Sequence, residues 1–299
     1  MRAADISALL RPRIGLLAMA GALAGAVLAV TGLAVTGLAM TGMEAGPGAL
    51  ARTLVLTAAG AFLLAGGASA LNQVQERGPD ARMERTKNRP LPAGRATPRA
   101  ALAVALACLA LAALALGSTP GGPAAALYVP LVVLIYNGCY TPLKRRTSLA
   151  MLVGGLAGAL PPVVGFAAAA GAPGDPRPLL LAGVFYAWQV PHFWLFSRLH
   201  KAEYAAAGFY APHDGVAGTR APGTLALWLM GYGALMLLLP ALGLMAQPWP
   251  KALVAALAVG VSLGARPLLA RERLGFAVVN ASLVLFLCFL AADALRLPA

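Results

Sequence analysis

The chain has 299 residues, of which 60% are hydrophobic and only 11% are charged. This composition excludes a soluble domain with one core, because too little polar surface exists to cover it, and it predicts a polytopic membrane protein. The net charge of +13 lies in short loops beside apolar segments. It therefore indicates membrane topology and attraction to anionic lipid or phosphorylated substrates, and we expect no nucleic-acid partner.

Nine apolar segments reach the roughly 20 residues that a helix needs to cross the hydrocarbon layer. The sequence therefore predicts an all-α membrane protein with about nine transmembrane helices, as a single domain over residues 1–299. Glycine and proline are frequent and blur the ends of the segments. The segments are approximately 15–38, 50–72, 98–117, 123–141, 149–171, 178–199, 223–246, 251–269 and 274–295.

When the loops alternate across the bilayer, Lys and Arg residues separate into groups of 19 and 4, which together make the 23 of the whole chain. Cytoplasmic loops carry the excess of positive charge. We therefore expect a protein of the inner (cytoplasmic) membrane, with its N-terminus in the cytoplasm and its C-terminus outside. The four cations on the outer side are Arg52, Arg177, Lys251 and Arg296.

The two longest loops on the predicted cytoplasmic side are about 73–97 and 200–222, and both carry acidic residues. They follow the second and sixth apolar segments. Two acidic loops that face one cavity would explain this pattern. Two loops that merely happen to be longer would explain it equally well, and the spacing does not separate the alternatives.

Oxygen-bearing side chains open the first loop. Asn72, Glu76 and Asp80 are spaced four residues apart, so on a continuous helix they would share one face. Such ligands suit Mg²⁺, which accepts phosphate oxygens as further ligands. Pro79 cannot continue a regular helix, so we expect Asp80 to lie beyond a kink. Because such a side chain at the membrane edge is unfavourable unless it is paired or functional, a functional role is favoured for Asn72 and Glu76.

Basic side chains follow these oxygen ligands directly. Arginine binds phosphate through two parallel hydrogen bonds and lysine binds it as a point charge, so this group can clamp the phosphates of a substrate. A purely topological role is the alternative for any one of them. The residues are Arg82, Arg85, Lys87 and Arg89.

Three motifs follow one another between residues 72 and 208. They are Asn72-x3-Glu76-x3-Asp80 with Arg85-Thr86-x2-Arg89-Pro90; Tyr140-Thr141-Pro142-Leu143-Lys144-Arg145 with Gly154-Gly155-x2-Gly158-x2-Pro161-Pro162; and Trp188-Gln189-x-Pro191-His192-Phe193 with Glu203-Tyr204-x3-Gly208. In this order and spacing they resemble the UbiA superfamily of intramembrane prenyltransferases, in the form that is characteristic of protoheme IX farnesyltransferases (heme O synthases).

The resemblance implies a fold and an activity. The helices would surround a central cavity that opens to the cytoplasmic face. The enzyme would add the farnesyl group of farnesyl diphosphate, together with water, to a vinyl group of heme B, which gives heme O and releases diphosphate. The resemblance also implies contact with a downstream heme A synthase or with terminal oxidase assembly. Two alternatives are a UbiA-type transferase with another aromatic or tetrapyrrole acceptor, and a heme or prenyl-lipid carrier without turnover.

The resemblance also assigns roles to single residues. Mg²⁺ would be held by Glu76 and Asp80, and their neutral variants are expected to lose turnover far more than stability because the loop lies near water. Glu203 would close the metal site or pair with a nearby lysine. His192 would contact the heme acceptor, or it would be a buried histidine bonded to a neighbouring helix. The remaining implied residues are Asn72, Tyr140 and Lys144 in catalysis, and Arg82, Arg85, Lys87, Arg89 and Arg145 at the diphosphate.

Three departures from the family pattern predict reduced or altered activity. The family usually has aspartate where this chain has Glu76, whose longer side chain would move the ion by about one C–C bond. Gly78-Pro79 intervenes between the two carboxylates. After Gly208 the chain reads Phe-Tyr-Ala-Pro-His-Asp-Gly, where the family has a more apolar stretch. All three departures lie in the predicted cytoplasmic loops.

Overall fold

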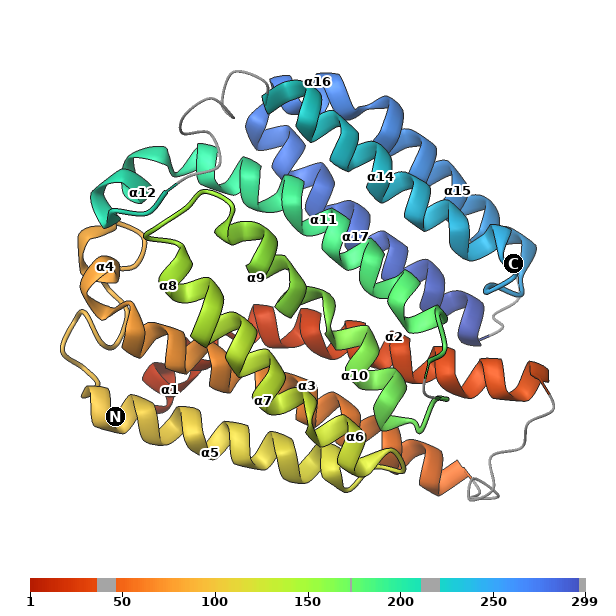
Figure 1. Cartoon of the computed structure of the whole chain (residues 1–299), viewed down its shortest axis with the longest axis horizontal. Coiled ribbons are helices and arrows are strands. Elements are labelled where there is room, and N and C mark those ends of the chain that lie inside the picture. Colours follow the sequence, from red (N-terminus) through yellow and green to blue (C-terminus); the bar gives the residue numbers. More distant parts are fainter. Residues whose placement is uncertain (37–46, 173, 211–220, 296–299) are drawn as a thin grey trace.

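The computed structural model describes residues 1–36, 47–172, 174–210 and 221–295. Within these ranges every regular element is a helix, which confirms the predicted fold class, and the long helices run alongside one another in Figure 1. The elements in chain order are α1 (Ala3–Leu10), α2 (Pro12–Thr36), α3 (Pro47–Gln75), α4 (Arg77–Arg82), α5 (Pro98–Gly117), α6 (Gly122–Ala126), α7 (Tyr128–Val133), the π-helical turn η1 (Leu134–Tyr140), α8 (Thr141–Leu143), α9 (Ala150–Ala159), α10 (Pro161–Ala168), α11 (Arg177–Leu199), α12 (Lys201–Ala207), α14 (Ala221–Ala241), α15 (Pro248–Leu263), α16 (Ala265–Ala270) and α17 (Glu272–Leu295).

Eight spans in the described ranges are long and apolar enough to cross a membrane, with mean hydropathy between 1.3 and 2.5. Each corresponds to one of the predicted spans. The remaining prediction, 251–269, is divided between α15, which has 16 residues, and the short α16. Nine full spans is thus an approximate count, and the chain is a multi-pass membrane protein. Two cations that entered the charge count, Arg220 and Arg296, lie outside the described residues.

Small residues let the N-terminal helices approach one another closely. α2 packs against α3 and α10, and α3 packs along α5. A β-carbon added to Gly165 on α10 would lie 1.7 Å from the carbonyl oxygen of Ala22 on α2, so only glycine fits there. Close approach of small residues is a common way for helices to associate in lipid. The largest apolar core lies in the other half, where α11, α14, α15 and α17 meet.

Two of the spans depart locally from α-helical geometry. The fourth span is π-helical over Leu134–Tyr140, directly before the turn that contains Pro142. The fifth is broken between α9 and α10, where Pro161 begins the second piece. Proline has no N–H group for the carbonyl four residues back, so both interruptions occur where a proline requires them. The break between α9 and α10 therefore follows from Pro161.

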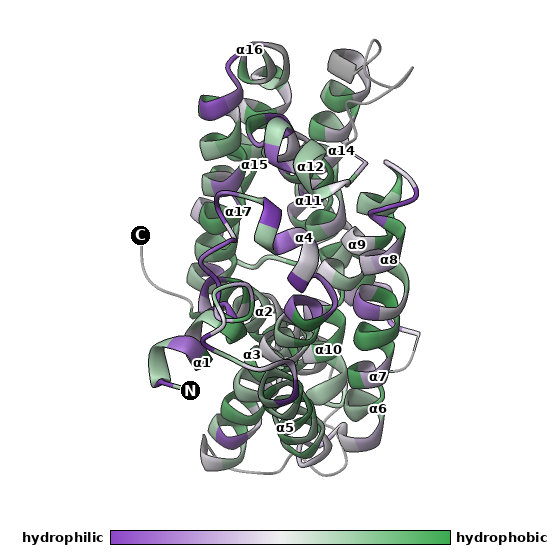
Figure 2. Ribbon diagram, turned by 90° about the vertical axis from the view of Figure 1, so that its left-hand side faces the viewer, coloured by the Kyte–Doolittle hydropathy of each residue, from purple (hydrophilic) through white to green (hydrophobic). Residues whose placement is uncertain are grey.

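The two longest loops meet at one end of the helices. α4 of the first loop lies beside α12 of the second in Figure 1, and the two elements are in contact. Met83 is buried against Ala207 and Phe209. Hydrophilic segments lie around α4 on this end of the molecule, which faces the viewer in Figure 2. The described parts of the two loops therefore face each other, as the first of the two alternatives predicted.

Candidate active site

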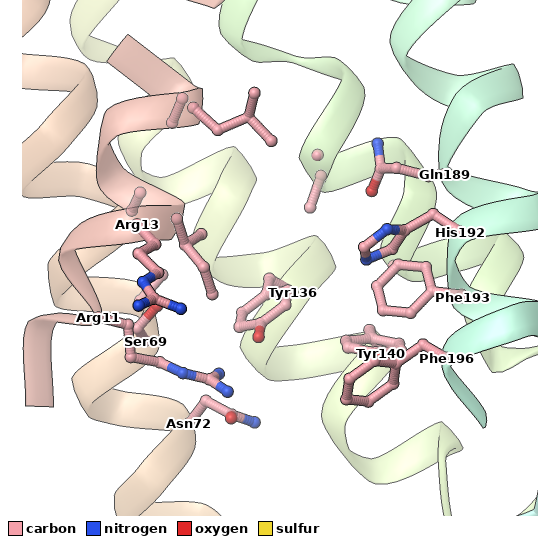
Figure 3. A pocket seen from close by; sticks show the side chains of 18 of the residues that line it. Arg11, Arg13, Ser69, Asn72, Tyr136, Tyr140, Gln189, His192, Phe193 and Phe196 are labelled. Carbon is pink, nitrogen blue, oxygen red and sulfur yellow. The ribbon is translucent and has the colours of Figure 1, made fainter. Parts of the chain in front are cut away.

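A cavity of about 850 Å³ lies behind these loops, among α2, α3, η1, α10, α11 and α17. Charged side chains line it at the loop end, which we call the mouth, and aliphatic and aromatic side chains line it among the spans. Figure 3 shows Arg11, Arg13 and Asn72 on one side and His192 and Phe196 on the opposite side. An apolar chamber with an ionic mouth suits a ligand that has a hydrocarbon tail and an anionic head.

Two carboxylates at the mouth each form an ion pair. Oε1 of Glu76 lies 2.5 Å from Nζ of Lys144, and Asp80 accepts hydrogen bonds from Nη1 of Arg89 at 2.8 and 2.7 Å. Glu76 is only 4% exposed and Asp80 only 1% exposed. The two carboxylates themselves are therefore buried, each against the cation with which it pairs.

The helix that carries these carboxylates breaks between them. α3 ends at Gln75, and Glu76 has φ −103° and ψ 15° before α4 begins. Pro79 cannot donate to the carbonyl of Gln75, and its ring would clash with that carbonyl in a continuous helix. The hydroxyl of Thr86 donates to the backbone carbonyl of Asp80 at 2.8 Å. The predicted kink is thus confirmed, and beyond it Asp80 still lines the cavity that Glu76 lines.

Buried hydrogen bonds join the first motif to the second. Asn72 donates its Nδ2 to the hydroxyl of Thr141 at 3.0 Å, and two hydrogen bonds of 3.0 Å link Gln75 to Asn137. The Oδ1 atom of Asn72 makes no hydrogen bond within the described chain and can accept one from a ligand. These bonds hold the π-helical turn against α3, which places Tyr140 on the cavity wall. π-Helical turns are frequent at functional sites.

Burial makes the charged form of each cation at the mouth unfavourable unless an anion lies beside it. Burial lowers the pKa of Arg89, and the nearby charge of Arg11 lowers it further. Burial also lowers the pKa of Lys144, against the opposing effect of the Glu76 carboxylate. Arginine remains charged in proteins whatever its surroundings. The pKa of lysine, in contrast, shifts readily when the side chain is buried. Lys144 is thus the cation at the mouth whose pKa depends on the balance between burial and the neighbouring carboxylate.

Arg85 connects the second loop to the cavity. Its Nε lies 3.6 Å from Oε2 of Glu203, and its guanidinium carbon lies 5.1 Å from the centre of the Phe196 ring. Arg85 lines the cavity, whereas Glu203 does not. Burial raises the pKa of the neighbouring Tyr204 to about 12, so this phenol stays protonated. Glu203 therefore holds Arg85 in place, and its part in a metal site stays a prediction.

Three other predicted phosphate ligands lie away from the cavity. Lys87 pairs with Glu84 at 2.6 Å, and Arg82 and Arg145 are exposed. None of these three cations is among the residues that line the cavity. Their positions are those of ordinary positive loop residues beside a span, and a role at the diphosphate stays a prediction for each.

An aromatic cluster surrounds His192 on the wall opposite α3. The rings of Trp188, Phe193, Phe196 and Phe276 have their centres between 4.6 and 6.4 Å from the centre of the imidazole. Three of these side chains come from α11 and one comes from α17. All line the cavity, which gives His192 a dry, flat environment that suits an aromatic ligand.

Hydrogen bonds set the tautomer of His192. Its Nδ1 lies 2.9 Å from Oδ1 of Asn280, and the Nδ2 of Asn280 donates to the carbonyl of Phe276 at 2.6 Å. Since the amide donor is already used, Oδ1 accepts the hydrogen bond and Nδ1 carries the proton. Nε2 then keeps its lone pair. A neutral imidazole in this state can ligate a metal ion, including heme iron.

Sequence reasoning missed part of this lining. Asn280 belongs to none of the three motifs, although an amide in an apolar span is unfavourable without a partner; its partner His192 is 88 residues away. The charge distribution gives Arg11 and Arg13 only a topological role, yet both line the cavity. Tyr136, which also lines it, was masked by the apolar run around it. Nothing local in the sequence marks these residues as lying on one surface.

The oxygen donors of the mouth fit Mg²⁺ better than a transition metal. Asn72, Glu76 and Asp80 line the same cavity, and no group of three or more His, Cys, Asp or Glu side chains that could hold a metal occurs in the described ranges. Mg²⁺ is usually held by one or two carboxylates together with water and substrate phosphates. Zn²⁺ sites usually contain histidine or cysteine ligands, which this end of the cavity lacks among the described residues.

Comparisons with known proteins agree with this geometry. The chain is 46% identical over 246 residues to a protoheme IX farnesyltransferase of Geobacter sulfurreducens, covering 81% of this chain and 83% of the relative. It is 33% identical to a protoheme IX farnesyltransferase of Nitratidesulfovibrio vulgaris over 99% of this chain and 96% of the relative. A UbiA homolog from Archaeoglobus fulgidus, solved with DMAPP and Mg²⁺, superposes with a TM-score of 0.66 at 15% identity, covering 98% of this chain and 100% of that one.

That structural likeness shows the fold alone, because the identity is low. The sequence likeness goes further. The profile of the UbiA prenyltransferase family matches residues 18–275, a range that contains α3, α11 and the carboxylates of the mouth. The chain therefore belongs to the UbiA prenyltransferase family.

Proposed function

We propose that this protein transfers the farnesyl group of farnesyl diphosphate to a vinyl group of heme B and so makes heme O. The observation that carries the proposal is one cavity with two different walls. Buried, ion-paired carboxylates lie at its mouth, and His192 lies in an aromatic cluster on α11. The first wall suits a diphosphate and the second suits a flat macrocycle. The names of the relatives over most of the chain support the same reaction.

The prenyl diphosphate lies with its tail among the spans and its head at the mouth. Glu76 and Asp80, with Asn72 beside them, would hold Mg²⁺, which would supply positive charge to the leaving diphosphate. Lys144 and Arg89, which pair with those carboxylates, then turn to the phosphate oxygens. Arg85 reaches the same cavity from the side of the second loop and adds a third cation.

Bond breaking at the allylic carbon needs stabilisation of positive charge. The C–O bond breaks and the electron pair leaves with the diphosphate, which gives an allylic cation. The rings of Tyr136 and Tyr140 have centres 5.3 Å apart and line the cavity, so their faces can stabilise this cation. The vinyl group attacks the cation through its terminal carbon, and water then adds to the neighbouring carbon with loss of a proton.

The heme acceptor lies against the aromatic cluster. Nε2 of His192 carries the lone pair and ligates the iron, which orients the ring with respect to the prenyl carbon. Trp188, whose indole N–H donates to the carbonyl of Val279 at 2.8 Å, keeps α11 fixed against α17. The histidine thus positions the acceptor and takes no part in bond breaking.

The placement in the cell follows from the distribution of charge. The protein lies in the inner membrane as one catalytic domain over residues 1–299, with the mouth and the N-terminus on the cytoplasmic side. Farnesyl diphosphate then reaches the mouth from the cytoplasm, and heme B enters from the membrane. The product passes to a heme A synthase or to terminal oxidase assembly.

The test is direct. Purified protein is mixed with heme B, farnesyl diphosphate and Mg²⁺, and the porphyrin products are separated and identified by mass. We expect heme O, and we expect none when EDTA replaces Mg²⁺. Heme binding without any product would indicate a carrier. Prenylation of a different aromatic or tetrapyrrole acceptor, with heme B unchanged, would indicate a transferase of other specificity.

A further inference from the structure

Two of the arginines that line the cavity have no carboxylate partner in the described chain. Lys144, Arg89 and Arg85 form ion pairs with acidic side chains. Arg11 and Arg13 line the same cavity and form no salt bridge with any described residue. Figure 3 shows both side chains on the wall that also carries Asn72. Arg13 is exposed and Arg11 is half-buried, so both side chains keep contact with solvent and are available to an anionic ligand in the cavity.

The backbone around Arg11 is held in an uncommon conformation. Arg11 has φ 51° and ψ 65°, in the left-handed region that normally favours glycine. Arg11 forms the turn between α1 and α2, and this turn places the side chains of Arg11 and Arg13 on the cavity wall. Non-glycine residues keep such a conformation only where the surrounding structure imposes it, and they gather at functional sites.

α1 is the part of the structure that imposes this turn. Gln73, the neighbour of Asn72, donates its Nε2 to the carbonyls of Ala8 and Leu9 at 3.2 and 2.8 Å. Leu9 is fully buried. Arg95 of the first loop donates its Nε to Asp5 at 2.9 Å. The short helix is therefore fixed to the helix and the loop that carry the carboxylates of the mouth.

The charges around the cavity exceed what a prenyl diphosphate and its Mg²⁺ require. Among the described lining residues there are five cations, which are Arg11, Arg13, Arg85, Arg89 and Lys144. Three of them pair with the carboxylates of Glu203, Asp80 and Glu76, so two positive charges remain. A fully ionised prenyl diphosphate carries about three negative charges and its Mg²⁺ carries two positive ones. Their complex therefore balances about one of the two remaining charges and leaves the other for a further anion.

We propose that Arg11 and Arg13 form a carboxylate subsite, which binds the two propionates of the heme acceptor. This inference rests on the proposed function and names two specificity-determining residues for it. When the carboxylates of the mouth take the metal, Arg89 and Lys144 become free for the diphosphate. Arg11 and Arg13 are not released by that exchange, because they have no carboxylate partner to lose, and they remain for the second substrate.

The experiment compares heme with its dimethyl ester, which has the same ring and iron but no carboxylates. Binding of each to the purified protein is followed by absorbance in the absence of prenyl diphosphate. The variant is Arg11→Asn with Arg13→Gln, because asparagine tolerates the left-handed conformation and glutamine keeps a good helix former in α2. The matched control is Arg146→Gln, an exposed cation that does not line the cavity.

We expect the wild type and the Arg146→Gln control to bind the diester about tenfold or more weakly than heme, since charge-assisted hydrogen bonds are lost. The double variant should bind heme as weakly as the wild type binds the diester, and it should no longer distinguish the two ligands. The KM for farnesyl diphosphate should stay within about threefold of the wild type. Arg13→Gln alone should show part of the same loss, which keeps the test open if the double variant does not fold.

Two results would overturn the subsite. One is a double variant that still discriminates against the diester as strongly as the wild type. The other is a raised KM for farnesyl diphosphate with heme affinity unchanged, which would assign both arginines to the phosphates. A wild type that does not bind heme at all would instead refute the proposed function, so the two failures are distinguishable.

Discussion

Different interactions hold the side chains on the two walls of the cavity. On the α3 side, Glu76 and Asp80 are buried and held by ion pairs with Lys144 and Arg89. On the α11 side, His192 is held by a neutral hydrogen bond and by ring contacts. The aromatic wall is complete before any ligand arrives. The charged wall is a set of internal pairs that a ligand has to rearrange.

This difference between the walls indicates which side chains serve function without adding stability. Buried ion pairs contribute little net stability, because the loss of hydration offsets the attraction, so their presence at the mouth points to a use. Aromatic packing stabilises the fold and shapes the acceptor site at the same time. Removing both partners of a pair on the charged wall should therefore separate activity from stability, whereas substitutions on the aromatic wall should affect both.

The largest effect is expected from the carboxylates. Glu76→Gln or Asp80→Asn should lower kcat by about 100-fold or more, because stabilisation by a metal is worth several kcal/mol. Asp80→Asn should also lower the free energy of unfolding, by up to about 3–5 kcal/mol, since Arg89 is left buried without its anion. Product formation and thermal unfolding measure the two effects.

A double substitution separates these effects. Asp80→Asn with Arg89→Met removes both charges and should recover much of the lost stability, while turnover stays as low as in Asp80→Asn. If Glu76→Gln and Asp80→Asn both kept wild-type turnover, the charged wall would not be the metal site.

The aromatic wall should respond through acceptor affinity. His192→Ala should weaken heme binding more than Asn280→Ala, for which we expect a loss of roughly tenfold, as for other residues that orient a metal ligand. In Asn280→Ala the imidazole can lose its fixed tautomer while the ring remains. Titration of the heme absorbance band measures both constants, with KM for farnesyl diphosphate as the control. Unchanged heme affinity in His192→Ala would remove the histidine from the acceptor site.

The shape of a cation on the charged wall should matter as well as its charge. Arg89→Lys keeps the charge but loses the planar group that donates to both oxygens of Asp80. We expect kcat/KM for farnesyl diphosphate to fall by about tenfold, with heme affinity unchanged. Steady-state kinetics at saturating heme test this, and Arg146→Lys is the exposed control. An equal loss in both variants would contradict a specific role for Arg89.

The smallest effect is a shift in pH dependence. Burial lowers the pKa of Lys144, so its charge is complete below that pKa and is lost as the pH rises through it. The alkaline limb of kcat/KM for farnesyl diphosphate should therefore lie below the usual range of lysine. Lys144→Arg should move this limb to higher pH, because arginine does not deprotonate. A limb at the same pH in both proteins would mean that another group titrates there.

Local rules predicted much of the fold and part of the site. Apolar length located the spans, and the missing N–H group of Pro79 predicted the break found beside it. The sequence predicted that Asn72, Glu76 and Asp80 lie together, because these residues are four apart in one short segment and because that segment resembles a family motif. The limits of such rules are clear at 251–269, where α15 ends early and α16 continues.

The other parts of the site depend on contacts that no local pattern encodes. The partner of His192 is Asn280, 88 residues away, and the pairing follows only once α11 and α17 are packed. Arg11 was hidden by the topological signal that surrounds it, since every cytoplasmic loop is expected to be basic. The burial of Met83 depends on Ala207 and Phe209, which follow a different span. Each of these features is set by helix packing and not by spacing along the chain.

The pairing of Glu76 with Lys144 and of Asp80 with Arg89 has a consequence for the order of binding. Free magnesium would have to displace a lysine or an arginine from its carboxylate, which would leave that cation without an anion in a largely apolar cavity. Magnesium that arrives with a prenyl diphosphate brings the replacement anion with it, so both exchanges can happen at once. We therefore expect ion and lipid head to bind synergistically, with a much weaker affinity for either alone, which calorimetry with and without a thio-analogue of the diphosphate can measure. Such coupling would prevent other metal ions from occupying the site until a prenyl diphosphate is bound.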